Sequence, residues 1–407
     1  MEEQKIQTIK LYDDASYETE FQAKILNVEQ EEERIIVVLD QTLFFPEEGG
    51  QSPDTGVLGG YPVLDVQIKD GKITHYIGKK PVEKELSDGT IVAVNGEEIE
   101  NGNTVHGKID WSVRFSNMQN HSGEHILSGL IHDRFGFDNV GFHLSPQTVT
   151  MDMNGTISQK QVEEIERAAN QAVYDNVEIS AVYMQKQELA DLNYRSKIDL
   201  EGPVRIVTIP GYDVCACCAP HVSRTGEIGQ IKILKAENYK GGIRLTIACG
   251  DRALADAKVK QDCLGEICQY LSANPDNVMD EIKRLQKETV SLKSQIVELK
   301  TQAMQEKVKA IEVQDNMCIF EPAMDANIQR NYVNMLLDKC NGICAVFSGS
   351  DSEGYRYLIA SKEKDTRAVN QILKDTFAAK GGGKPQMVQG SVNGSEEEIR
   401  AALEKEL

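Results

Sequence analysis

The chain has 407 residues, 40% of them hydrophobic and 27% charged, which is the composition of a globular protein with room for two or three domains. Its net charge of −20 argues against a protein that binds nucleic acid over most of its surface, because phosphate contacts need clustered Lys and Arg. A local basic groove is still compatible with this charge. No apolar run is long enough to span a bilayer and no signal-peptide core opens the chain, so we expect a cytoplasmic protein whose nine Cys are reduced thiols or metal ligands.

Residues 1–92 are rich in short β-type runs and turns, which predicts a small β-barrel. Asp70 and Gly71 lie between two alternating segments and predict a hairpin turn. A glycine-rich segment at residues 40–56 interrupts the strands. Its adjacent glycines would let the backbone approach a ligand closely, although the same residue types also make ordinary turns.

Residues 93–271 combine strand-like runs with helical periodicity, which predicts an α+β sandwich. One helix is predicted from about residue 112 to 135, with Gly136 as its stop signal. A second, amphipathic helix follows Ser158, which starts a capping box. Strands are expected on both sides of a Cys/His segment near residue 217, so we expect this segment at one mouth of the sheet.

Two pairs of metal-type side chains stand out in this region. His121 and His125 share one face of the predicted helix, and Cys217 and His221 repeat the same spacing of four. Together they form the N/S donor set that tetrahedral Zn²⁺ prefers, so we predict one zinc ion per chain held by these residues. Two further thiols are close enough in sequence to compete as ligands, namely Cys215 and Cys218.

Each pair also has a simpler interpretation. An isolated HxxxH pattern in a helix is usually a coincidence, and the Cys/His segment alone could be a turn with buried thiols. His121 to His125 also spells H-x-x-E-H, the inverted zinc-peptidase pattern in which Glu124 would be the general base. A metallopeptidase would need a distant carboxylate as its third ligand, and it leaves Cys217 and His221 without a role.

Residues 272–312 predict one long charged helix with a heptad seam. The seam favours self-association as a homodimer, or else packing of the helix on its own protein. Residues 313–407 alternate between strand and helix patterns and predict an α/β domain. Its residues 380–390 are expected to form a loop after a helix, with three glycines as a phosphate cradle or a flexible turn. The seam consists of Val278, Ile282, Leu285, Thr289, Leu292, Ile296, Leu299 and Ala303.

In chain order these segments resemble the stand-alone alanyl-tRNA editing proteins, in the long form that ends like alanyl-tRNA synthetase. Residues 45–51 are similar to the family's FYP-x-GGGQ element, with Glu in place of one glycine. Residues 121–125 are similar to its HxxxH motif, and residues 217–221 to its CxxxH motif. Residues 225–229 match its TGEIG run. Residues 381–390 are similar to its terminal GGGG-x-P-x-x-A-Q-G segment, with Lys and Val where Arg and Ala are common.

The resemblance implies an α+β protein of four parts. These are a β-barrel in residues 1–92, a zinc-binding editing domain in 93–271, a coiled-coil-type helix in 272–312 and a DHHA1-type α/β domain in 313–407. It also implies zinc-dependent hydrolysis of the ester between a wrong amino acid and the tRNA for alanine, serine first and glycine second. Such editing is needed because binding alone discriminates poorly between small side chains. The alternatives are the metallopeptidase and a non-catalytic RNA-binding protein with a structural zinc.

Roles for single residues follow from the resemblance as well. As catalytic candidates, Gln51 would lie near the tRNA end, Thr42 would sense the serine hydroxyl and His143 would line the pocket. The resemblance also implies ATP binding. A truncated synthetase is disfavoured, because the sequence has no candidate ATP-activating region. The expected tRNA contacts are Gly49, Gly50, Arg244, Lys380 and Lys384, of which Arg244 is equally well explained as a surface charge.

Overall fold

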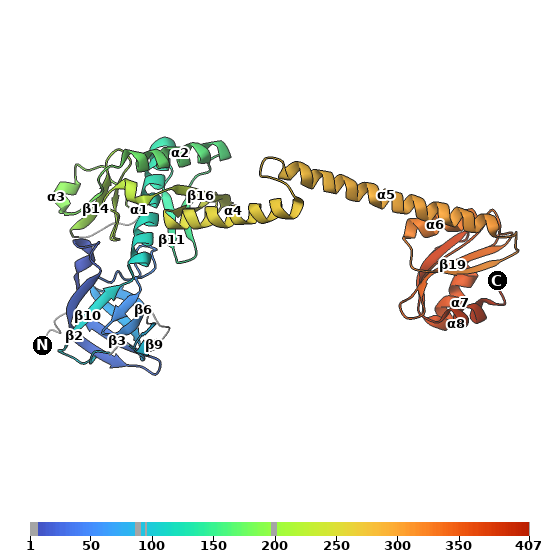
Figure 1. The fold of residues 1–407 in the computed structure, drawn as a ribbon, viewed down its shortest axis with the longest axis horizontal. Coiled ribbons are helices and arrows are strands. Elements are labelled where there is room, and N and C mark those ends of the chain that lie inside the picture. The colour runs from blue at the N-terminus through green and yellow to red at the C-terminus, as the bar shows by residue number, and fades with distance from the viewer. Residues whose placement is uncertain (1–6, 86–90, 94–95, 197–201, 407) are drawn as a thin grey trace. The chain divides into compact units, whose positions relative to one another are not determined.

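The computed structural model describes residues 7–85, 91–93, 96–196 and 202–406. The chain divides into two compact units, residues 1–263 and residues 264–407, which combine helices with β-sheets (Figure 1). The mixed α and β fold class is therefore confirmed, whereas the division into four domains by residue number stays a prediction. Of the helices in the described ranges, none is both long and apolar enough to cross a bilayer.

The first unit begins with a closed β-barrel. Its strands are β2 (Glu20–Gln30), β3 (Arg34–Leu39), β5 (Gly56–Leu58), β6 (Tyr61–Lys69), β7 (Lys72–Gly78) and β10 (Thr104–Ile109), paired in the order β10-β2-β3-β7-β6-β5. Buried and exposed positions alternate along β2 and β7, so every second side chain fills the interior. Asp70 and Gly71 turn β6 into β7 with φ of 52° and 80°, as the predicted hairpin requires.

The barrel extends past the boundary expected at residue 92. The sequence interpretation assigns residues 104–109 to the second domain, but β10 pairs antiparallel with both β2 and β5 and so closes the barrel. Its inward positions are Val105, Gly107 and Ile109, and the glycine leaves room for the ring of Phe21. Short strand pairs are also present: β1 (Ile9–Lys10) with β4 (Gln41–Thr42), and β8 (Glu83–Glu85) with β9 (Ile91–Ala93).

Helix α1 (Trp111–Phe135) forms the core of the rest of the first unit (Figure 1). Asp110 caps its N-terminus by accepting hydrogen bonds from the backbone N–H groups of Ser112 and Val113, and Gly136, at φ 69°, ends it. Residues 117–131 are buried without interruption. The predicted helix is therefore correct to within one residue, and its histidines lie inside the protein.

Two sheets, ordered β11-β12-β17-β16 and β13-β14-β15 in the described ranges, surround α1 with helix α2 (Gln159–Asp175). The strands are β11 (Asn139–Leu144), β12 (Val149–Met153), β13 (Ser180–Met184), β14 (Val204–Ile209), β15 (Asp213–Ala216), β16 (Ile231–Tyr239) and β17 (Gly242–Cys249). The predicted capping box of Ser158 and Gln161 starts α2. Short helical turns are η1 (Leu11–Asp13), α3 (Lys186–Leu189) and η2 (Thr225–Ile228).

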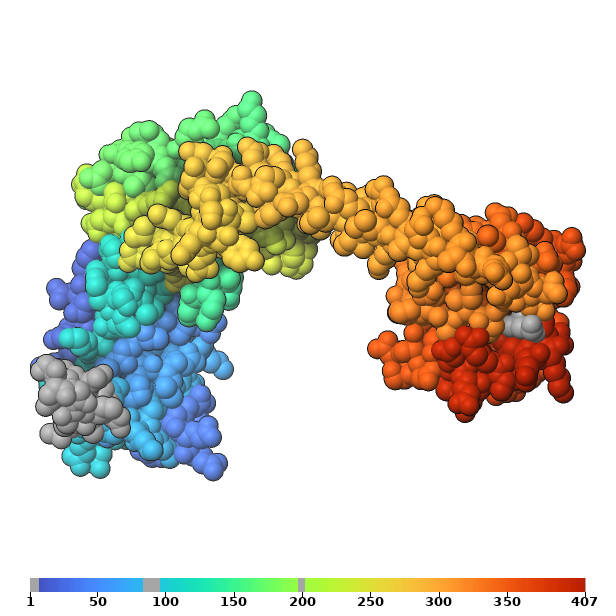
Figure 2. Space-filling model, turned by 45° about the vertical axis from the view of Figure 1, so that its right-hand side comes forward, coloured from blue at the N-terminus to red at the C-terminus, as the bar shows by residue number. Residues whose placement is uncertain are grey.

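Two helices, α4 (Asp251–Leu271) and α5 (Val278–Ala310), connect these elements to the last domain. The helix α4 is absent from the sequence prediction, whereas α5 falls within the predicted residues 272–312. Most of α5 is exposed (Figure 2). Its seam residues Leu285, Leu292 and Ile296 are 39%, 50% and 52% exposed. The partner of the seam stays a prediction.

The second unit ends in a sheet ordered β18-β19-β20-β22-β21 with helices packed on it. The elements are β18 (Met317–Glu321), α6 (Ala326–Leu336), β19 (Ile343–Ser350), β20 (Gly354–Ser361), α7 (Arg367–Phe377), β21 (Lys380–Lys384), β22 (Met387–Val392) and α8 (Glu396–Leu403). The predicted loop at residues 380–390 is wrong, because β21 and β22 pair as an antiparallel hairpin. Its Gly381 and Gly390 face each other, and a Cβ on either would collide with the Tyr357 hydroxyl.

Candidate metal centre

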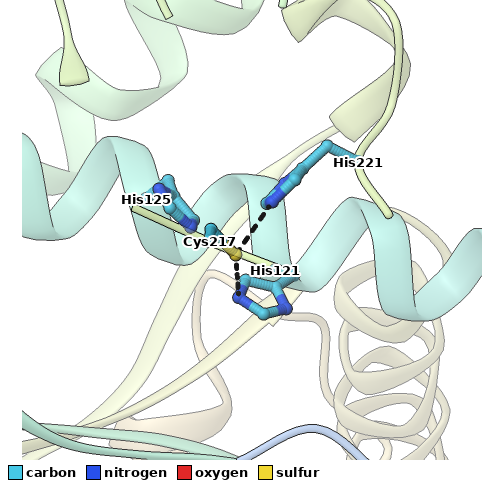
Figure 3. Close-up of side chains that lie close together, drawn as sticks. All are labelled: His121, His125, Cys217 and His221. Carbon is cyan, nitrogen blue, oxygen red and sulfur yellow. Dashed lines mark hydrogen bonds between the residues drawn. The ribbon is translucent and has the colours of Figure 1, made fainter. Parts of the chain in front are cut away.

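Four side chains from two distant segments converge in the first unit (Figure 3). His121 and His125 come from one face of α1, and Cys217 and His221 from the segment after β15. The Sγ atom of Cys217 lies 3.5 Å from Nε2 of His121 and 3.4 Å from Nε2 of His221. One donor atom from each of the four lies within 4.8 Å of the others. The predicted residues thus form a group that could hold a metal ion.

The outer ring nitrogen of each histidine in the group has its own partner. Nδ1 of His121 lies 2.7 Å from Oε1 of Gln51, and Nδ1 of His125 lies 2.8 Å from Oδ2 of Asp213. Nδ1 of His221 lies 3.0 Å from the Ser122 hydroxyl. Such partners fix the ring orientation and the tautomer of metal-binding histidines. The arrangement therefore leaves the Nε2 atoms to face the shared centre.

The protonation of the group favours a thiolate. Burial by itself disfavours a charged sulfur, but interactions with the surrounding imidazoles, His121 first, hold the pKa of Cys217 well below its usual range. Burial also lowers the pKa of His221 to about 3, which keeps that ring neutral. Burial opposes the charge on His125 too, yet Asp213 and Cys217 together raise the pKa of His125 well above its ordinary value. Thiolate and neutral imidazole are the forms that bind Zn²⁺, so the donor set fits this ion once His125 releases its proton.

The two competing thiols lie in different surroundings. Cys215 forms a second possible metal group with His125 and Asp213, but Asp213 already accepts hydrogen bonds from Nε and Nη2 of Arg195, both at 2.8 Å. Burial raises the pKa of Cys215, which disfavours its thiolate. Cys218 belongs to neither of the possible metal groups found in the described ranges. The four predicted ligands therefore make the better donor set.

A cavity of about 630 Å³ adjoins the group. His121, His125 and Cys217 line it, together with the glycine-rich loop before β5. That loop lies against β11, where the Leu144 N–H donates to the Gly50 carbonyl oxygen at 2.7 Å. Gly50 has φ 86°, and a Cβ there would collide with the Phe142 carbonyl oxygen, so the close approach requires glycine. A larger cavity of about 830 Å³ shares part of this lining but touches neither His121 nor Cys217.

A buried ion pair fastens the glycine-rich loop to α1. The Arg114 guanidinium bonds to the Asp54 carboxylate and to the Leu43 carbonyl oxygen, and the Arg114 and Asp54 side chains have no exposed surface. Oδ2 of Asp54 also accepts the Phe45 N–H at 2.8 Å. This pair spans sixty residues of sequence and belongs to no motif, so sequence reasoning missed it. Asp213 and Ser122 also belong to no motif, so sequence reasoning missed them as well.

The remaining predicted residues divide into two sets. Gln51 contacts His121 but is not among the residues that line the cavity, whereas Gly49 and Gly50 line it together with His121. Thr42 is fully buried in the barrel, where its hydroxyl lies 2.9 Å from Nε2 of His75. It is not part of the cavity lining.

On the β11-β12-β17-β16 sheet, His143 is exposed, and its neighbour Phe142 lines the cavity instead, with its ring centroid 4.8 Å from that of His121. Arg244 donates to both oxygens of Asp152 at 2.6 and 2.7 Å. Lys380 and Lys384 are exposed on β21 in the second unit.

Comparison with known proteins finds one matching family and several relatives of this chain. The family described as threonyl and alanyl tRNA synthetase second additional domain matches residues 204–246, which contain Cys217 and His221. The chain is 28% identical to an alanine–tRNA ligase of Ignicoccus hospitalis over 93% of its length, but it covers only 40% of that ligase.

The chain is 29% identical to the alanyl-tRNA editing protein AlaX-L of Pyrococcus horikoshii, over 97% of this chain and 98% of that protein. It is 27% identical to the alanyl-tRNA editing protein Aarsd1 of Danio rerio, over 88% and 84% respectively. The resemblance stated from the motifs is confirmed: the chain is a homologue of the alanyl-tRNA editing proteins.

Proposed function

We propose that this protein is a trans-editing hydrolase that removes a wrongly attached amino acid from the tRNA for alanine, serine first and glycine second. The observation that carries the proposal is the convergence of His121, His125, Cys217 and His221 beside a cavity of about 630 Å³. The cavity is lined partly by residues of the segment that matches the synthetase editing-type domain, residues 204–246. The names of two relatives that the chain covers over most of their length agree with this activity.

The reaction is the hydrolysis of one ester bond by one water molecule. Water adds to the aminoacyl carbonyl carbon, the bond from that carbon to the ribose oxygen breaks, and the ribose oxygen takes up a proton. His121, His125, Cys217 and His221 would hold one Zn²⁺ per chain. When bound, this ion would supply positive charge for the ester and its attacking water. The residues Gln51, Asp213 and Ser122 would keep the imidazoles in position through their Nδ1 atoms.

Gln51, which is fully buried beside His121, offers the site a further group. Its Nε2 atom is buried and has no hydrogen-bond partner among the described residues. A buried donor without an acceptor is costly, which supports a ligand oxygen as its partner in the working enzyme. We assign this role to Gln51. Gly49 and Gly50 would let the tRNA terminus approach the backbone closely.

The finer assignments rest on the resemblance. Thr42 would sense the serine hydroxyl, for which its own hydroxyl would have to leave His75. His143, which is exposed and is not among the cavity-lining residues, is carried over as a catalytic candidate on the same basis. Contacts with the tRNA would come from Gly49, Gly50, Arg244, Lys380 and Lys384, and the α5 seam would join two copies as a homodimer. ATP binding is carried over on the same basis.

Incubation of the purified protein with Ser-tRNA for alanine tests the function directly. We expect release of serine, its loss after treatment with a metal chelator and its recovery with added Zn²⁺. The variant Cys217→Ala should lose both the metal and the activity, whereas Cys263→Ala, at an exposed cysteine of α4, should keep both. A protein that binds zinc and this tRNA but never releases serine would instead be the RNA-binding alternative.

A further inference from the structure

We propose that Arg205 is a positioning residue of the metal centre, which holds the segment from Cys217 to His221 in the conformation that metal binding needs. This inference deepens the proposed function and rests on its metal centre. Arg205 lies on β14 and is 7% exposed. Its guanidinium bonds to the backbone of the ligand segment, so it acts on the metal through Cys217 and not by direct contact.

The ligand segment depends on other elements for its conformation. Residues 217–222 follow β15 and lie outside the helices and strands. Ala219 has no exposed surface, and Pro220 is buried and has no N–H group to donate. Buried carbonyl groups need hydrogen-bond partners, and an irregular segment does not supply them within itself as a helix or a sheet does. The positions of Cys217 and His221 are therefore set by the groups that bond to this backbone.

Arg205 bonds to the segment through both its main chain and its side chain. The Arg205 carbonyl oxygen accepts a hydrogen bond from the Cys217 N–H at 3.0 Å. Nη1 of Arg205 donates to the Cys217 carbonyl oxygen at 3.2 Å and to the Ala219 carbonyl oxygen at 2.8 Å. One residue thus holds both backbone polar groups of Cys217. A guanidinium suits this role because its donors form a rigid planar fork.

The same arginine connects the ligand segment with the barrel. Nε of Arg205 lies 3.7 Å from Oδ1 of Asp13 in η1, and Oδ2 of Asp13 accepts a hydrogen bond from the Tyr183 hydroxyl at 2.8 Å. Ala219 belongs to the buried core of the barrel, and Cys217 packs against that core. The ion pair orients the guanidinium, and the apolar contacts fix the backbone that it bonds. The barrel therefore contributes to the metal centre, although the four ligands come from α1 and the segment after β15.

Titration of zinc against a competing chelator tests this role in the wild type, Arg205→Met, Arg205→Lys and Arg356→Met. Arg205→Met should weaken zinc binding about tenfold to a hundredfold, the range found when groups that orient metal ligands are removed. Arg205→Lys should recover part of the affinity, since an ammonium group can still donate to one carbonyl oxygen. Arg356 is the matched control, because it lies on β20 in the second unit and also donates to a backbone carbonyl oxygen, that of Met324. Arg356→Met should keep the wild-type affinity.

Asp13→Asn tests the connection to the barrel. This variant should bind zinc more weakly than the wild type but more tightly than Arg205→Met. Added to Arg205→Met, it should cause no further loss, because Asp13 acts through the guanidinium and the two effects are then not additive. Losses that simply add would contradict the connection through Arg205.

Two further measurements separate positioning from a general loss of stability. Circular dichroism identifies a temperature at which each variant is folded, and the affinities are compared there. With Co²⁺ in place of zinc, the thiolate-to-metal absorption band should weaken in Arg205→Met and persist in Arg356→Met. If Arg205→Met does not fold, Arg205→Lys decides, since it should still bind zinc more weakly than the wild type.

The possible failures are distinct. If the wild type binds zinc and the folded Arg205 variants bind it equally tightly, this inference alone fails. A raised KM for Ser-tRNA in those variants would then identify Arg205 as a substrate contact. If the wild type binds no zinc, the metal centre fails, and the proposed zinc-dependent function fails with it.

Discussion

At the scale of single residues, the site depends on side chains that contact the metal-ligating histidines through the ring nitrogen that faces away from the shared centre. Asp213 accepts from Nδ1 of His125 inside the protein, with the two side chains 2% and 4% exposed. An identical pair, Asp138 with Nδ1 of His132 at 2.9 Å, lies on the surface away from the group. The chain thus contains its own comparison between a supporting carboxylate and an ordinary one.

We therefore expect Asp213→Asn to weaken zinc binding about tenfold to a hundredfold, because the imidazole of His125 loses its anionic partner. Asp138→Asn should leave the affinity unchanged. Competition with a chelator of known affinity measures both variants. Equal affinities for the wild type and Asp213→Asn would show that this carboxylate does not support the metal site.

His75 makes the stability of the barrel depend on pH. Burial lowers the pKa of His75 from 6.5 to about 4, so the folded ring stays neutral where the unfolded chain takes up a proton. The unfolded state then binds more protons between these two values, and stability falls as the pH falls through this window. We expect the free energy of unfolding, measured with urea, to fall by roughly 2 kcal/mol from pH 7 to pH 5 in the wild type and by less in His75→Gln. The same pH slope in both proteins would contradict this origin.

At the scale of elements, the Arg114–Asp54 pair joins α1 to the glycine-rich loop. Removing one partner of a buried pair leaves the other charge uncompensated, at a cost of about 3 to 5 kcal/mol. Arg114→Met should therefore lose about this much in urea unfolding and also displace Gln51 from His121, whereas Arg114→Met with Asp54→Asn should recover part of it. The exposed pair of Lys108 and Glu20 is the control, since Lys108→Ala should cost at most about 1 kcal/mol. Similar losses of stability in Arg114→Met and in Lys108→Ala would contradict this account.

Local signals were enough to predict some elements and not others. Gly136 marks the end of α1, and the spacing of four within each ligand pair predicts which side chains can share an ion. The hairpin at residues 380–390 was missed because glycines usually indicate a loop, and only the Tyr357 hydroxyl facing them explains their place in strands. Asp213 and Ser122 could not be predicted, because common polar residues acquire their roles only through contacts distant in sequence.

At the scale of the whole molecule, α5 carries the exposed heptad seam. Leu292 and Ile296 belong to the heptad seam and are half exposed, while Val297 is equally exposed beside it. If two copies associate through the seam, Leu292→Glu and Ile296→Glu should shift the protein to a monomer, and Val297→Glu should not. Sedimentation over a range of concentrations measures this. A wild-type protein that is monomeric throughout would exclude the homodimer.

Zinc-edge X-ray absorption on the purified protein tests the central claim most directly, because it reports which atoms surround the metal. Joint coordination by His121, His125, Cys217 and His221 predicts one zinc per chain with one sulfur at about 2.3 Å and nitrogens at about 2.0 to 2.1 Å. The sulfur signal should vanish in Cys217→Ala. A protein that takes up no zinc, or a zinc shell without sulfur in the wild type, would contradict the account.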